Sequence, residues 1–414
     1  MTEFDYDLAV IGAGRIGLPW AAVLAAEGGL SVTCVDIDEE RVAKVNDGIS
    51  PFEEPGLAEH IQAAVDQGQL RATSDETVIE SHEYVASTIN APRNQMDKFI
   101  GILREYASYL SPEQVVINRT TLPTHMIARM QEVLAEEMAE PPEFAVLPER
   151  LAEGNAIEEI KTLPKIVGVE TAKGEKRLRE LLNPIGEQLR ITDPRTAMFV
   201  KLIDNTYRDG LFAIANQIAY AADVLDLDSQ KAIELANDDY PRNDIPFPGP
   251  VGGKCLPKDP HFLMDETICD QPTTPDLFNT TRRTNAKLPS YVSTKVLKER
   301  PAKVAILGLS YKAGIGDTFN SPAEDIKTDL IDQGVNVAAH DPHADEGVPN
   351  TDTAIANADV VVLATNHAEY AGIEAAINEH ASPDGTVYDL WGFLNREELA
   401  LTYDGFGIGG GRKR

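Results

Sequence analysis

The stretch Asp7-Leu-Ala-Val-Ile-Gly12-Ala-Gly14-Arg-Ile-Gly17 determines how the first part of this 414-residue chain folds. A short apolar run leads directly into a Gly-x-Gly-x-x-Gly pattern. The alanine-rich stretch from Leu18 to Glu27 predicts a helix, and Ser31 to Asp36 predicts the next strand. A strand, a glycine-rich turn, a helix and a second strand in this order predict a parallel α/β sheet of the dinucleotide-binding type.

The glycine-rich turn and the residue that ends the second strand together indicate the cofactor. The glycines allow a tight turn and bring backbone N–H groups close to a pyrophosphate at a helix N-terminus. Asp36 stands roughly 20 residues further on, where its carboxylate can bind both ribose hydroxyls. The same carboxylate would repel a 2′-phosphate, so the sequence favours NAD over NADP. Arg41 can stack on the adenine edge, and a solvated helix residue is an equally good interpretation of it.

Further strands are predicted at Tyr84 to Ile89 and at Gln114 to Asn118. The second leads into a polar turn that holds Thr120, and ligands of doubly wound sheets collect at such strand ends. A third strand ends in Glu149 and Arg150, for which a surface ion pair is an equal alternative. We expect these residues to contact the cofactor: Gly12, Gly14, Arg15, Ile16, Gly17, Asp36, Arg41, Thr88 and Thr120.

The middle of the chain is predicted to be helical. From Thr196 to about Leu225 there is no proline, and apolar residues recur every three to four positions. Lys201, Asn205 and Arg208 are spaced so that they share one face of this helix. Two cations and an amide on one face suit an anion or a developing oxyanion, and a solvated face is the alternative. A helix of this length also suits a subunit interface.

The segment Phe247-Pro-Gly-Pro-Val-Gly-Gly-Lys-Cys-Leu-Pro-Lys-Asp259 carries the strongest indication of chemistry. It places Cys255 among glycines, with Lys254 and Lys258 beside it and the carboxylate of Asp259 four residues on. A thiol normally titrates near ~8.5, and adjacent cations favour the thiolate, which is the nucleophilic form. The glycines remove side-chain bulk, so that the backbone can approach a ligand closely. The alternative is a turn between helices that happens to hold a small apolar residue.

A second unit of the nucleotide-binding type begins at Lys303. A helix from Ala323 to Gln333 and a strand from Val335 to Asp341 repeat the pattern of the N-terminal unit. The glycine pattern is lost after Gly308, so we expect a nucleotide other than a dinucleotide here, with Lys312 near its phosphate.

Composition and charge exclude several classes of function. The chain has 37 basic and 67 acidic residues, a net charge of −30, which disfavours nucleic acid and anionic membranes as partners. No apolar run approaches the roughly 20 residues of a membrane span, and three scattered cysteines are too few for a disulfide framework or a zinc site. We therefore expect a cytoplasmic protein, and our hypothesis for the evenly spread acidic residues is a surface adapted to high salt. The tail from Gly405 to Arg414 is expected to be flexible.

The order of these segments resembles the nucleotide-sugar 6-dehydrogenases, the family that includes UDP-glucose and UDP-N-acetylmannosamine dehydrogenases. The resemblance runs from Leu8 to about Gly392. The matching segments are Gly12 to Gly17, Leu147-Pro-Glu-Arg-Leu-Ala-Glu-Gly154, Val200-Lys-Leu-Ile-Asp-Asn-Thr-Tyr-Arg-Asp209, Gly252-Gly-Lys-Cys255 through Asp259, and Leu307-Gly-Leu-Ser-Tyr-Lys312.

This resemblance implies an α/β protein with two Rossmann-like doubly wound domains joined by a central helical domain. The NAD-binding domain would occupy residues 1–194, and the UDP-sugar-binding domain residues 299–414. The helical domain between them, residues 195–298, would hold the long helix, the reactive cysteine and a homodimer interface.

The resemblance also implies a four-electron oxidation of the C6 alcohol of a UDP-sugar to a carboxylate, with two NAD. Cys255 would trap the aldehyde of the first step as a thiohemiacetal, and the second oxidation would give a thioester that water hydrolyses. Lys201 and Asn205 would stabilise the oxyanions, and no metal is required because Lys201 supplies the electrophile.

The remaining roles concern water and substrate. Glu149 and Asp259 would position or activate the hydrolytic water, and Thr120 would help to hold water or cofactor. The resemblance implies these substrate contacts: Glu149, Arg150, Leu151, Lys201, Asn205, Arg208, Arg242, Phe247, Gly252, Gly253 and Lys312.

The motifs favour the branch of the family that acts on UDP-N-acetylhexosamines, with UDP-N-acetylmannosamine first. Pro148-Glu149-Arg150 and Ala236-Asn-Asp-Asp-Tyr-Pro-Arg242 are similar to that branch, whereas Leu256-Pro-Lys258-Asp259 is similar to the UDP-glucose branch. The chain departs from the family at Lys254, where His or Ser is usual, at Phe319, where arginine is usual, and at Asn118-Arg119-Thr120, where Glu-Ser-Thr is usual. UDP-glucose and UDP-N-acetylglucosamine are the alternative substrates. A degenerate paralogue that binds a UDP-sugar without oxidising it is the alternative from another class.

Overall fold

The computed structural model describes residues 4–186, 188–267 and 276–409. The chain divides into two compact units, Met1–Ile203 and Asp204–Arg414, each with its own sheet. The division falls inside one long helix, α8 (Pro194–Leu225), so the predicted central helical region contributes to both units.

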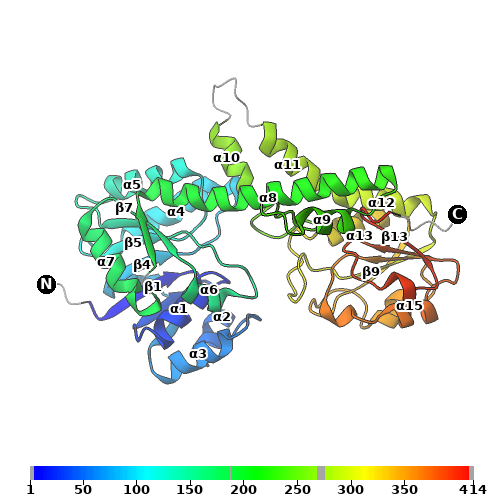
Figure 1. The fold of residues 1–414 in the computed structure, drawn as a ribbon. Coiled ribbons are helices and arrows are strands. Elements are labelled where there is room, and N and C mark those ends of the chain that lie inside the picture. The colour runs from blue at the N-terminus through cyan, green and yellow to red at the C-terminus, as the bar shows by residue number, and fades with distance from the viewer. Residues whose placement is uncertain (1–3, 187, 268–275, 410–414) are drawn as a thin grey trace. The chain divides into compact units, whose positions relative to one another are not determined.

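The first unit is built on an eight-stranded sheet with the order β3-β2-β1-β4-β5-β6-β7-β8 (Figure 1). Neighbouring strands run parallel, except that β6 and β7 pair antiparallel. The strands are β1 (Tyr6–Ile11), β2 (Val32–Val35), β3 (Leu70–Thr73), β4 (His82–Ser87), β5 (Val115–Asn118), β6 (Glu143–Val146), β7 (Lys165–Val169) and β8 (Leu189–Thr192). The helices before α8 are α1 (Gly17–Ala26), α2 (Glu39–Asn46), α3 (Leu57–Asp66), α4 (Met96–Ala107), α5 (Thr124–Glu137), α6 (Ala156–Thr162) and α7 (Ala172–Leu182), with short 3₁₀ helices η1 (Glu76–Ser81), η2 (Arg93–Gln95) and η3 (Asn183–Ile185).

Apolar burial around β1 and α1 positions the glycine-rich turn of this unit. Leu8, Ala9 and Val10 of β1 are fully buried, as expected for a central parallel strand covered on both faces. In α1, every residue from Gly17 to Ala25 is buried, so it is a core helix rather than an amphipathic surface helix. α1 contacts α3 and α6, and this packing fixes the start of the helix that follows the glycines.

The second unit contains a five-stranded, fully parallel sheet with the order β10-β9-β11-β12-β13. Counted from the first strand of the unit, this is the 2-1-3-4-5 order of flavodoxin-like sheets. The strands are β9 (Lys303–Leu307), β10 (Asn336–His340), β11 (Val360–Leu363), β12 (Thr386–Asp389) and β13 (Thr402–Gly405). The helices after α8 are α9 (Ser229–Asn237), α10 (Asp259–Thr267), α11 (Asp276–Ala286), α12 (Leu288–Lys298), α13 (Pro322–Asp332), α14 (Thr351–Ile355) and α15 (Glu374–His380), with 3₁₀ helices η4 (Ala368–Tyr370) and η5 (Arg396–Glu398).

Strand β9 shows how the second sheet is covered on both faces. Val304 and Ile306 join one apolar cluster with residues of α12 and α13. Ala305 and Leu307 join another cluster with residues of α14 and α15. Alternate side chains of a strand point to opposite faces, so the sheet is sandwiched between the two helix pairs.

The predicted fold class, two Rossmann-like parallel sheets with a central helical region, is confirmed. The prediction of a flexible tail is wrong for residues 405–409. β13 includes Gly405, the side chain of Phe406 is fully buried, and the N–H of Gly409 donates to the carbonyl of Leu227 at 2.8 Å. Residues 410–414 lie outside the described residues.

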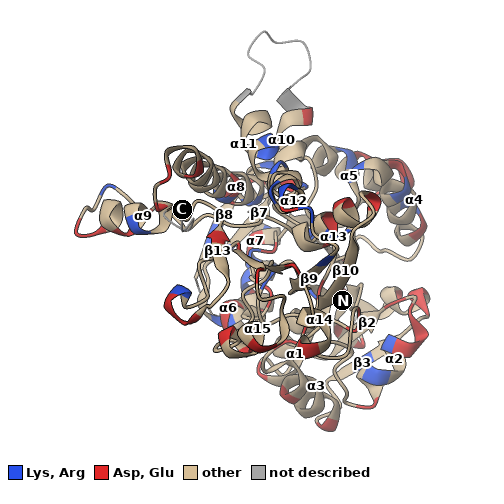
Figure 2. Ribbon diagram, turned by 90° about the vertical axis from the view of Figure 1, so that its right-hand side faces the viewer, with Lys and Arg blue, Asp and Glu red and all other residues tan. Residues whose placement is uncertain are grey.

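Figure 2 shows Asp and Glu on elements throughout the chain rather than in one block. The first turn of α2 contains Glu39 and Glu40 in the first unit, and the first turn of α13 contains Glu324 and Asp325 in the second. Acidic groups in a first turn also stabilise the helix, because its N-terminus carries partial positive charge. Within the described residues, none of the helices combines the length and the apolar character that crossing a membrane requires.

Candidate active site

The turn between β1 and α1 is locked by protein contacts on one side and open on the other. Gly12 has a φ of +101°, and a side chain on Gly17 would place its Cβ 2.0 Å from the Gly12 carbonyl oxygen. The hydroxyl of Thr88 donates a shared hydrogen bond to the carbonyls of Ile11 (3.0 Å) and Gly12 (2.8 Å). A Cβ on Gly14, by contrast, would meet nothing within 4 Å. Open space beside a helix N-terminus is what a pyrophosphate requires.

Asp36 follows β2 and is tied to the same turn. Its Oδ2 accepts the N–H of Ala13 at 2.7 Å, and its Oδ1 accepts the N–H of Asp38 at 3.0 Å. Arg41 Nη1 also lies 2.9 Å from Oδ2, so Arg41 forms an ion pair with Asp36. A carboxylate has room for about four hydrogen bonds, so three protein contacts leave capacity for a ribose. These residues fit NAD.

The other predicted cofactor contacts differ in exposure. Arg15 pairs with Glu153 at 2.6 Å, and Ile16 is 37% exposed at the start of α1. Thr120 is buried, and its hydroxyl donates to the carbonyl of Ile89 at 2.9 Å. The hydrogen of Thr120 is therefore used inside the protein, which leaves its oxygen as an acceptor.

Glu149 is a buried carboxylate at the carboxyl edge of the first sheet, so its interpretation as part of a surface ion pair is wrong. Its Oε1 accepts the N–H groups of Arg150 (2.8 Å) and Leu151 (3.2 Å), and its Oε2 pairs with the guanidinium of Arg119. Arg119, which the sequence reasoning missed, is 4% exposed and stacks on Trp20, with Cζ 4.0 Å from the ring centroid. Burial lowers the pKa of Arg119, and the charge of Glu149 opposes that shift.

Three residues on successive turns of α8 are buried: Lys201, Asn205 and Asp209, with exposed fractions of 7%, 3% and 0%. Arg208, which helical spacing places on the same side of α8, is exposed, so the buried part of this stripe continues to Asp209 instead. Burial raises the pKa of Asp209, although its ion pair with Arg282 opposes this. The stripe therefore carries a cation, an amide and a paired carboxylate.

Cys255 is exposed and lies just before α10. Its carbonyl oxygen accepts the N–H groups of Lys258 (3.0 Å) and Asp259 (2.8 Å), which starts the helix. Asp259 is fully buried, and its Oδ2 accepts a hydrogen bond from Asn205 Nδ2 at 2.6 Å. Lys258 Nζ lies 3.6 Å from the other oxygen of Asp259. The Asn205 amide is thus joined to the segment that carries the cysteine.

Cys34 is a contrasting thiol in the first unit. It is fully buried in β2, and burial, with the charge of Asp36 in addition, raises its pKa to about 12. Such a thiol is protonated and inaccessible, so it is no nucleophile. Cys269 lies outside the described residues.

The loop that carries Cys255 is tied at both ends by buried polar side chains. Asn216 of α8 forms two hydrogen bonds with the backbone of Gly249. Its Nδ2 donates to the Gly249 carbonyl at 3.1 Å, and its Oδ1 accepts the Gly249 N–H at 2.8 Å. At the other end, Arg282 Nη1 donates to the carbonyl of Leu256 at 3.3 Å while it pairs with Asp209. The loop therefore keeps one conformation through contacts within the second unit.

The glycines of this loop are required by packing against the protein itself. A Cβ on Gly252 would lie 2.6 Å from the carbonyl oxygen of Asn320 and from Cδ of Pro322. Gly253 has a φ of +84°, and a Cβ there would lie 2.7 Å from the ring of Tyr311. Packing within the protein is therefore an alternative explanation for these glycines, which we expected to make room for a ligand.

Two of the departures from the family pattern, Lys254 and Phe319, lie close together in the second unit. Lys254 Nζ lies 2.6 Å from Asp317 Oδ2 and 5.9 Å from the ring centroid of Phe319. Lys254 thus brings a positive charge to the segment in which the usual arginine is missing. The other predicted substrate contacts of this unit, Arg242, Phe247 and Lys312, have exposed side chains.

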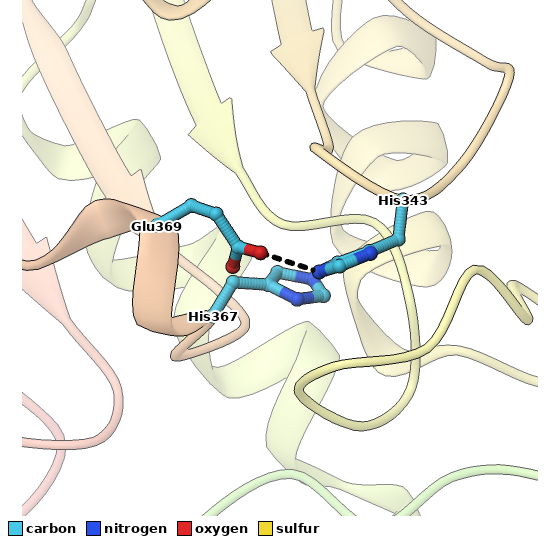
Figure 3. Close-up of side chains that lie close together, drawn as sticks. All are labelled: His343, His367 and Glu369. Atoms are coloured by element: carbon cyan, nitrogen blue, oxygen red, sulfur yellow. Dashed lines mark ion pairs between the residues drawn. The ribbon is translucent and has the colours of Figure 1, made fainter. Parts of the chain in front are cut away.

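Figure 3 shows a cluster of His343, His367 and Glu369 that follows β10 and β11 and has the ligand types of a metal site. His343 Nε2 lies 3.0 Å from a Glu369 oxygen. His367 Nδ1 accepts the N–H of Gly314 at 3.1 Å, and its Nε2 lies 3.0 Å from Asp341 Oδ2. Because Nδ1 accepts, Nε2 carries the hydrogen and donates it to the carboxylate. His367 therefore has no lone pair left for a metal ion, and we interpret the cluster as structural.

A glycine-rich turn followed by a carboxylate after the second strand, and an exposed cysteine four residues before a buried carboxylate that binds an amide, are features expected of an NAD-dependent dehydrogenase. Residues 6–186 match the NAD-binding domain of the UDP-glucose/GDP-mannose dehydrogenase family, residues 195–287 its central domain, and residues 305–396 its UDP-binding domain. The chain belongs to this family and is an NAD-dependent nucleotide-sugar dehydrogenase.

Similar proteins from archaea carry the name UDP-N-acetyl-D-mannosamine dehydrogenase. The protein of Methanocaldococcus jannaschii is 30% identical over 409 residues, which cover 94% of this chain and 93% of the relative. That of Pyrococcus horikoshii is 30% identical over 421 residues, 97% and 99% of the two chains. A solved structure of the UDP-D-ManNAc dehydrogenase from Pyrococcus horikoshii has a TM-score of 0.88 at 27% identity and covers 97% of this chain and 99% of its own. The resemblance drawn from the motifs and the assignment of NAD are confirmed.

Proposed function

We propose that this protein oxidises UDP-N-acetyl-D-mannosamine to UDP-N-acetyl-D-mannosaminuronate. The C6 alcohol loses two electrons to become an aldehyde and two more to reach the oxidation level of a carboxylic acid, and one water supplies the second oxygen. When held by the glycine-rich turn and Asp36 of the first unit, NAD would supply the hydride acceptor for both oxidations.

Cys255 is the nucleophile in this proposal. Its thiolate adds to the C6 aldehyde, a C–S bond forms, and the former carbonyl oxygen takes up the electron pair. Loss of a hydride from C6 converts this thiohemiacetal into a thioester. Water then adds to the thioester carbon, and the C–S bond breaks to release the carboxylate and the thiolate. The place of Cys255 just before α10 favours the thiolate, because a helix N-terminus stabilises negative charge.

Lys201 and Asn205 stabilise the oxyanions that form at C6. Both are buried, and donors act more strongly on developing charge where water is excluded. The Asn205 amide carries two hydrogens, and the bond to Asp259 uses one of them. Glu149 and Asp259 position or activate the hydrolytic water, Thr120 offers an acceptor, and Arg150 with Leu151 contacts the substrate.

The observation that carries the proposal is the 2.6 Å hydrogen bond between Asn205 and Asp259. It holds an oxyanion-stabilising amide against the first residue of α10, four positions after the exposed Cys255. A degenerate binding protein would have no need for this buried pair beside a reactive thiol. The names of the similar archaeal proteins support N-acetylmannosamine over glucose as the sugar.

The substrate is tested by following NADH formation with UDP-N-acetylmannosamine, UDP-N-acetylglucosamine, UDP-N-acetylgalactosamine and UDP-glucose. We expect the highest kcat/KM with UDP-N-acetylmannosamine and two NADH per sugar. A preference for UDP-glucose would contradict the branch assignment. Binding of these sugars without any NADH would favour the degenerate paralogue.

The covalent step is tested with Cys255→Ser. A hydroxyl is a weaker nucleophile and a poorer leaving group than a thiol, so this variant should bind NAD normally and fail to turn over. An ester on the new hydroxyl would hydrolyse slowly and add mass to the protein. Cys34→Ala is the matched control and should keep its turnover. Full activity of Cys255→Ser would remove the covalent mechanism.

We also propose that the protein is a cytoplasmic homodimer with a surface suited to high salt, and that its product serves polysaccharide biosynthesis. Phe199, Ile203 and Tyr207 recur every four residues on α8 with 45%, 44% and 65% exposure, and such an apolar stripe fits a second copy of the chain. Light scattering of the wild type and of Tyr207→Glu tests the dimer. Thermal unfolding in a salt series tests the surface, and maximal stability in dilute buffer would contradict it.

A further inference from the structure

We infer that Arg119 is a positioning residue for the reaction, because it pairs with the Glu149 carboxylate and orients it at the carboxyl edge of the first sheet. This inference rests on the proposed function, in which Glu149 handles the hydrolytic water. Nothing in the motif that contains Glu149 points to Arg119, which stands 30 residues earlier in the chain.

The topology of the sheet brings the two residues together. Arg119 directly follows β5, Glu149 follows β6, and these strands are parallel neighbours with Asn118 opposite Val146. Their carboxyl ends therefore lie at the same edge, and the guanidinium of Arg119 reaches Oε2 of Glu149. The side chains are 4% and 10% exposed, so water screens this ion pair little.

The guanidinium is also fixed from its flat side. Its Cζ lies 4.0 Å from the ring centroid of Trp20, which is 2% exposed on α1. A planar guanidinium on an aromatic face is a favourable and oriented contact. Arg119 thereby connects Glu149 to the helix that follows the cofactor turn. Within the described residues, Nε of Arg119 is buried without a hydrogen-bond partner. Such a group is costly to bury, which argues for a role beyond stability.

The other charged side chains near Glu149 donate hydrogen bonds to backbone carbonyls rather than to its carboxylate. Lys165 of β7 is attracted by Glu149, but its Nζ donates to the carbonyls of Leu163 and Ile185, each at 3.3 Å. Arg150 offers Glu149 its backbone N–H, whereas its Nη1 reaches the carbonyl of Pro164 at 3.4 Å.

Together these contacts occupy the carboxylate in a defined way. Two backbone N–H groups bind Oε1 of Glu149, and Arg119 binds Oε2. A cation in hydrogen-bond contact favours the ionised form of a carboxyl group, and only that form can accept a proton from water. The three contacts also give the carboxylate of Glu149 one orientation, as a base for water requires.

The test compares Arg119→Met with the wild type in steady-state and burst kinetics. Without the cation, we expect the acid limb of the turnover profile to move up by about one pH unit or more. Steady-state turnover should fall about ten-fold or more while the burst of NADH remains, because hydrolysis slows and acylated Cys255 accumulates. Mass spectrometry detects that acyl group. Arg119→Lys keeps the positive charge but loses the planar guanidinium and its stacking on Trp20. The acid limb of this variant should therefore lie between those of the wild type and Arg119→Met.

The matched control is Arg177→Met. Arg177 pairs with Glu83 at 2.8 Å and lies over Tyr84 at 5.2 Å, a similar trio in the same unit with no proposed role. Both variants should lose thermal stability, and only Arg119→Met should change the pH profile. Equal profiles for Arg119→Met and the wild type would overturn the inference.

A second measurement separates this inference from the proposed function. The carbon-13 signal of the Glu149 carboxylate, assigned by its absence in Glu149→Gln, is titrated in the wild type and in Arg119→Met. A rise of the midpoint by about one pH unit or more supports the inference even without turnover. An unchanged midpoint overturns it. Absence of NADH from wild-type protein with every UDP-sugar overturns the proposed function instead.

Discussion

The two nucleotide folds of this chain begin in the same way. Gly12 follows β1 with a φ of +101°, and Gly308 follows β9 with a φ of +89°. Each turn is then secured by a threonine from a neighbouring strand end. Thr88 donates to the carbonyl of Gly12 at 2.8 Å, and Thr365 donates to the carbonyl of Ser310 at 2.6 Å.

The folds differ in the aspartate after their second strands. Asp36 uses three contacts with the protein. Asp341 is saturated: Oδ2 accepts from Leu309 N, from Ser310 N and Oγ, and from His367, at 2.7 to 3.0 Å. Its Oδ1 accepts two more backbone N–H groups, each at 3.0 Å or less. The same position therefore keeps hydrogen-bonding capacity for a ligand in one unit, whereas in the other unit the protein uses all of it. This agrees with NAD-binding and UDP-binding domains in this order.

The largest effect that would sharpen this comparison is expected for Asp341→Asn. The amide keeps the shape but removes the charge and turns N–H donors toward the backbone N–H groups of Leu309 and Ser310. We expect a loss of about 3 kcal/mol in the free energy of unfolding, measured with urea. Asp36→Asn should lose clearly less, because fewer contacts depend on it. Equal losses of unfolding free energy would show that the two aspartates stabilise their units to the same extent.

The stabilising effect of Asp341 should also depend on pH in the unmodified protein. Burial favours the neutral acid, but the hydrogen bond from His367 and the N–H groups of Ser310 and His343 outweigh it and hold the pKa of Asp341 well below its ordinary range. A lowered pKa contributes stability that is complete above the unfolded value, near ~3.9, and declines as pH falls from there. The stability difference between wild type and Asp341→Asn should therefore be constant at neutral pH and shrink below about pH 4. Urea unfolding at several pH values measures it.

Asp36→Ala should act on the cofactor instead. Loss of a charged acceptor for the ribose hydroxyls should weaken NAD binding about ten-fold or more and narrow the gap between NAD and NADP. Calorimetric titration with NAD, NADP and UDP checks this, and UDP affinity should not change. If the wild-type protein used NADP as well as NAD, its carboxylate would not face the ribose.

The smallest effects are expected for Thr88→Val and Thr365→Val, which remove the matching hydroxyls at nearly constant shape. Each should cost about 1 kcal/mol of unfolding free energy. Only Thr88→Val should also raise the KM for NAD a few-fold, because only the Gly12 turn holds the cofactor. An equal rise in the Thr365→Val variant would mean that the second unit also influences NAD.

Features that depend on neighbouring residues could be predicted from the sequence. The glycine turn, the place of Asp36 and the long helix follow from local spacing, and the predicted helix from Thr196 to about Leu225 matches α8 closely. The strands β3, β8 and β13 went unnoticed, since each has a charged residue within its four positions and therefore no apolar run.

Pairings between distant segments could not be predicted. Arg119 and Glu149 are 30 residues apart, and Asp209 and Arg282 are 73 apart, so no local pattern connects them. The helical spacing did place Lys201 and Asn205 together, but Arg208 and Asp209 are adjacent, and only packing decides which of them is buried. The glycines near Cys255 were interpreted as room for a ligand. The sequence does not show that Gly253 packs against Tyr311, which is a second reason for glycine at that position.

The loop around Cys255 has a consequence for the entropy of binding. Fixing the backbone of one residue costs about 1–2 kcal/mol. Between Gly249 and Leu256 this ordering is already complete, because Asn216 and Arg282 hold the two ends in place. The cost is therefore incurred once, when the chain folds, and does not recur with each sugar nucleotide. Contacts that a bound ligand makes with this loop are then not offset by the cost of ordering Gly249 and Leu256.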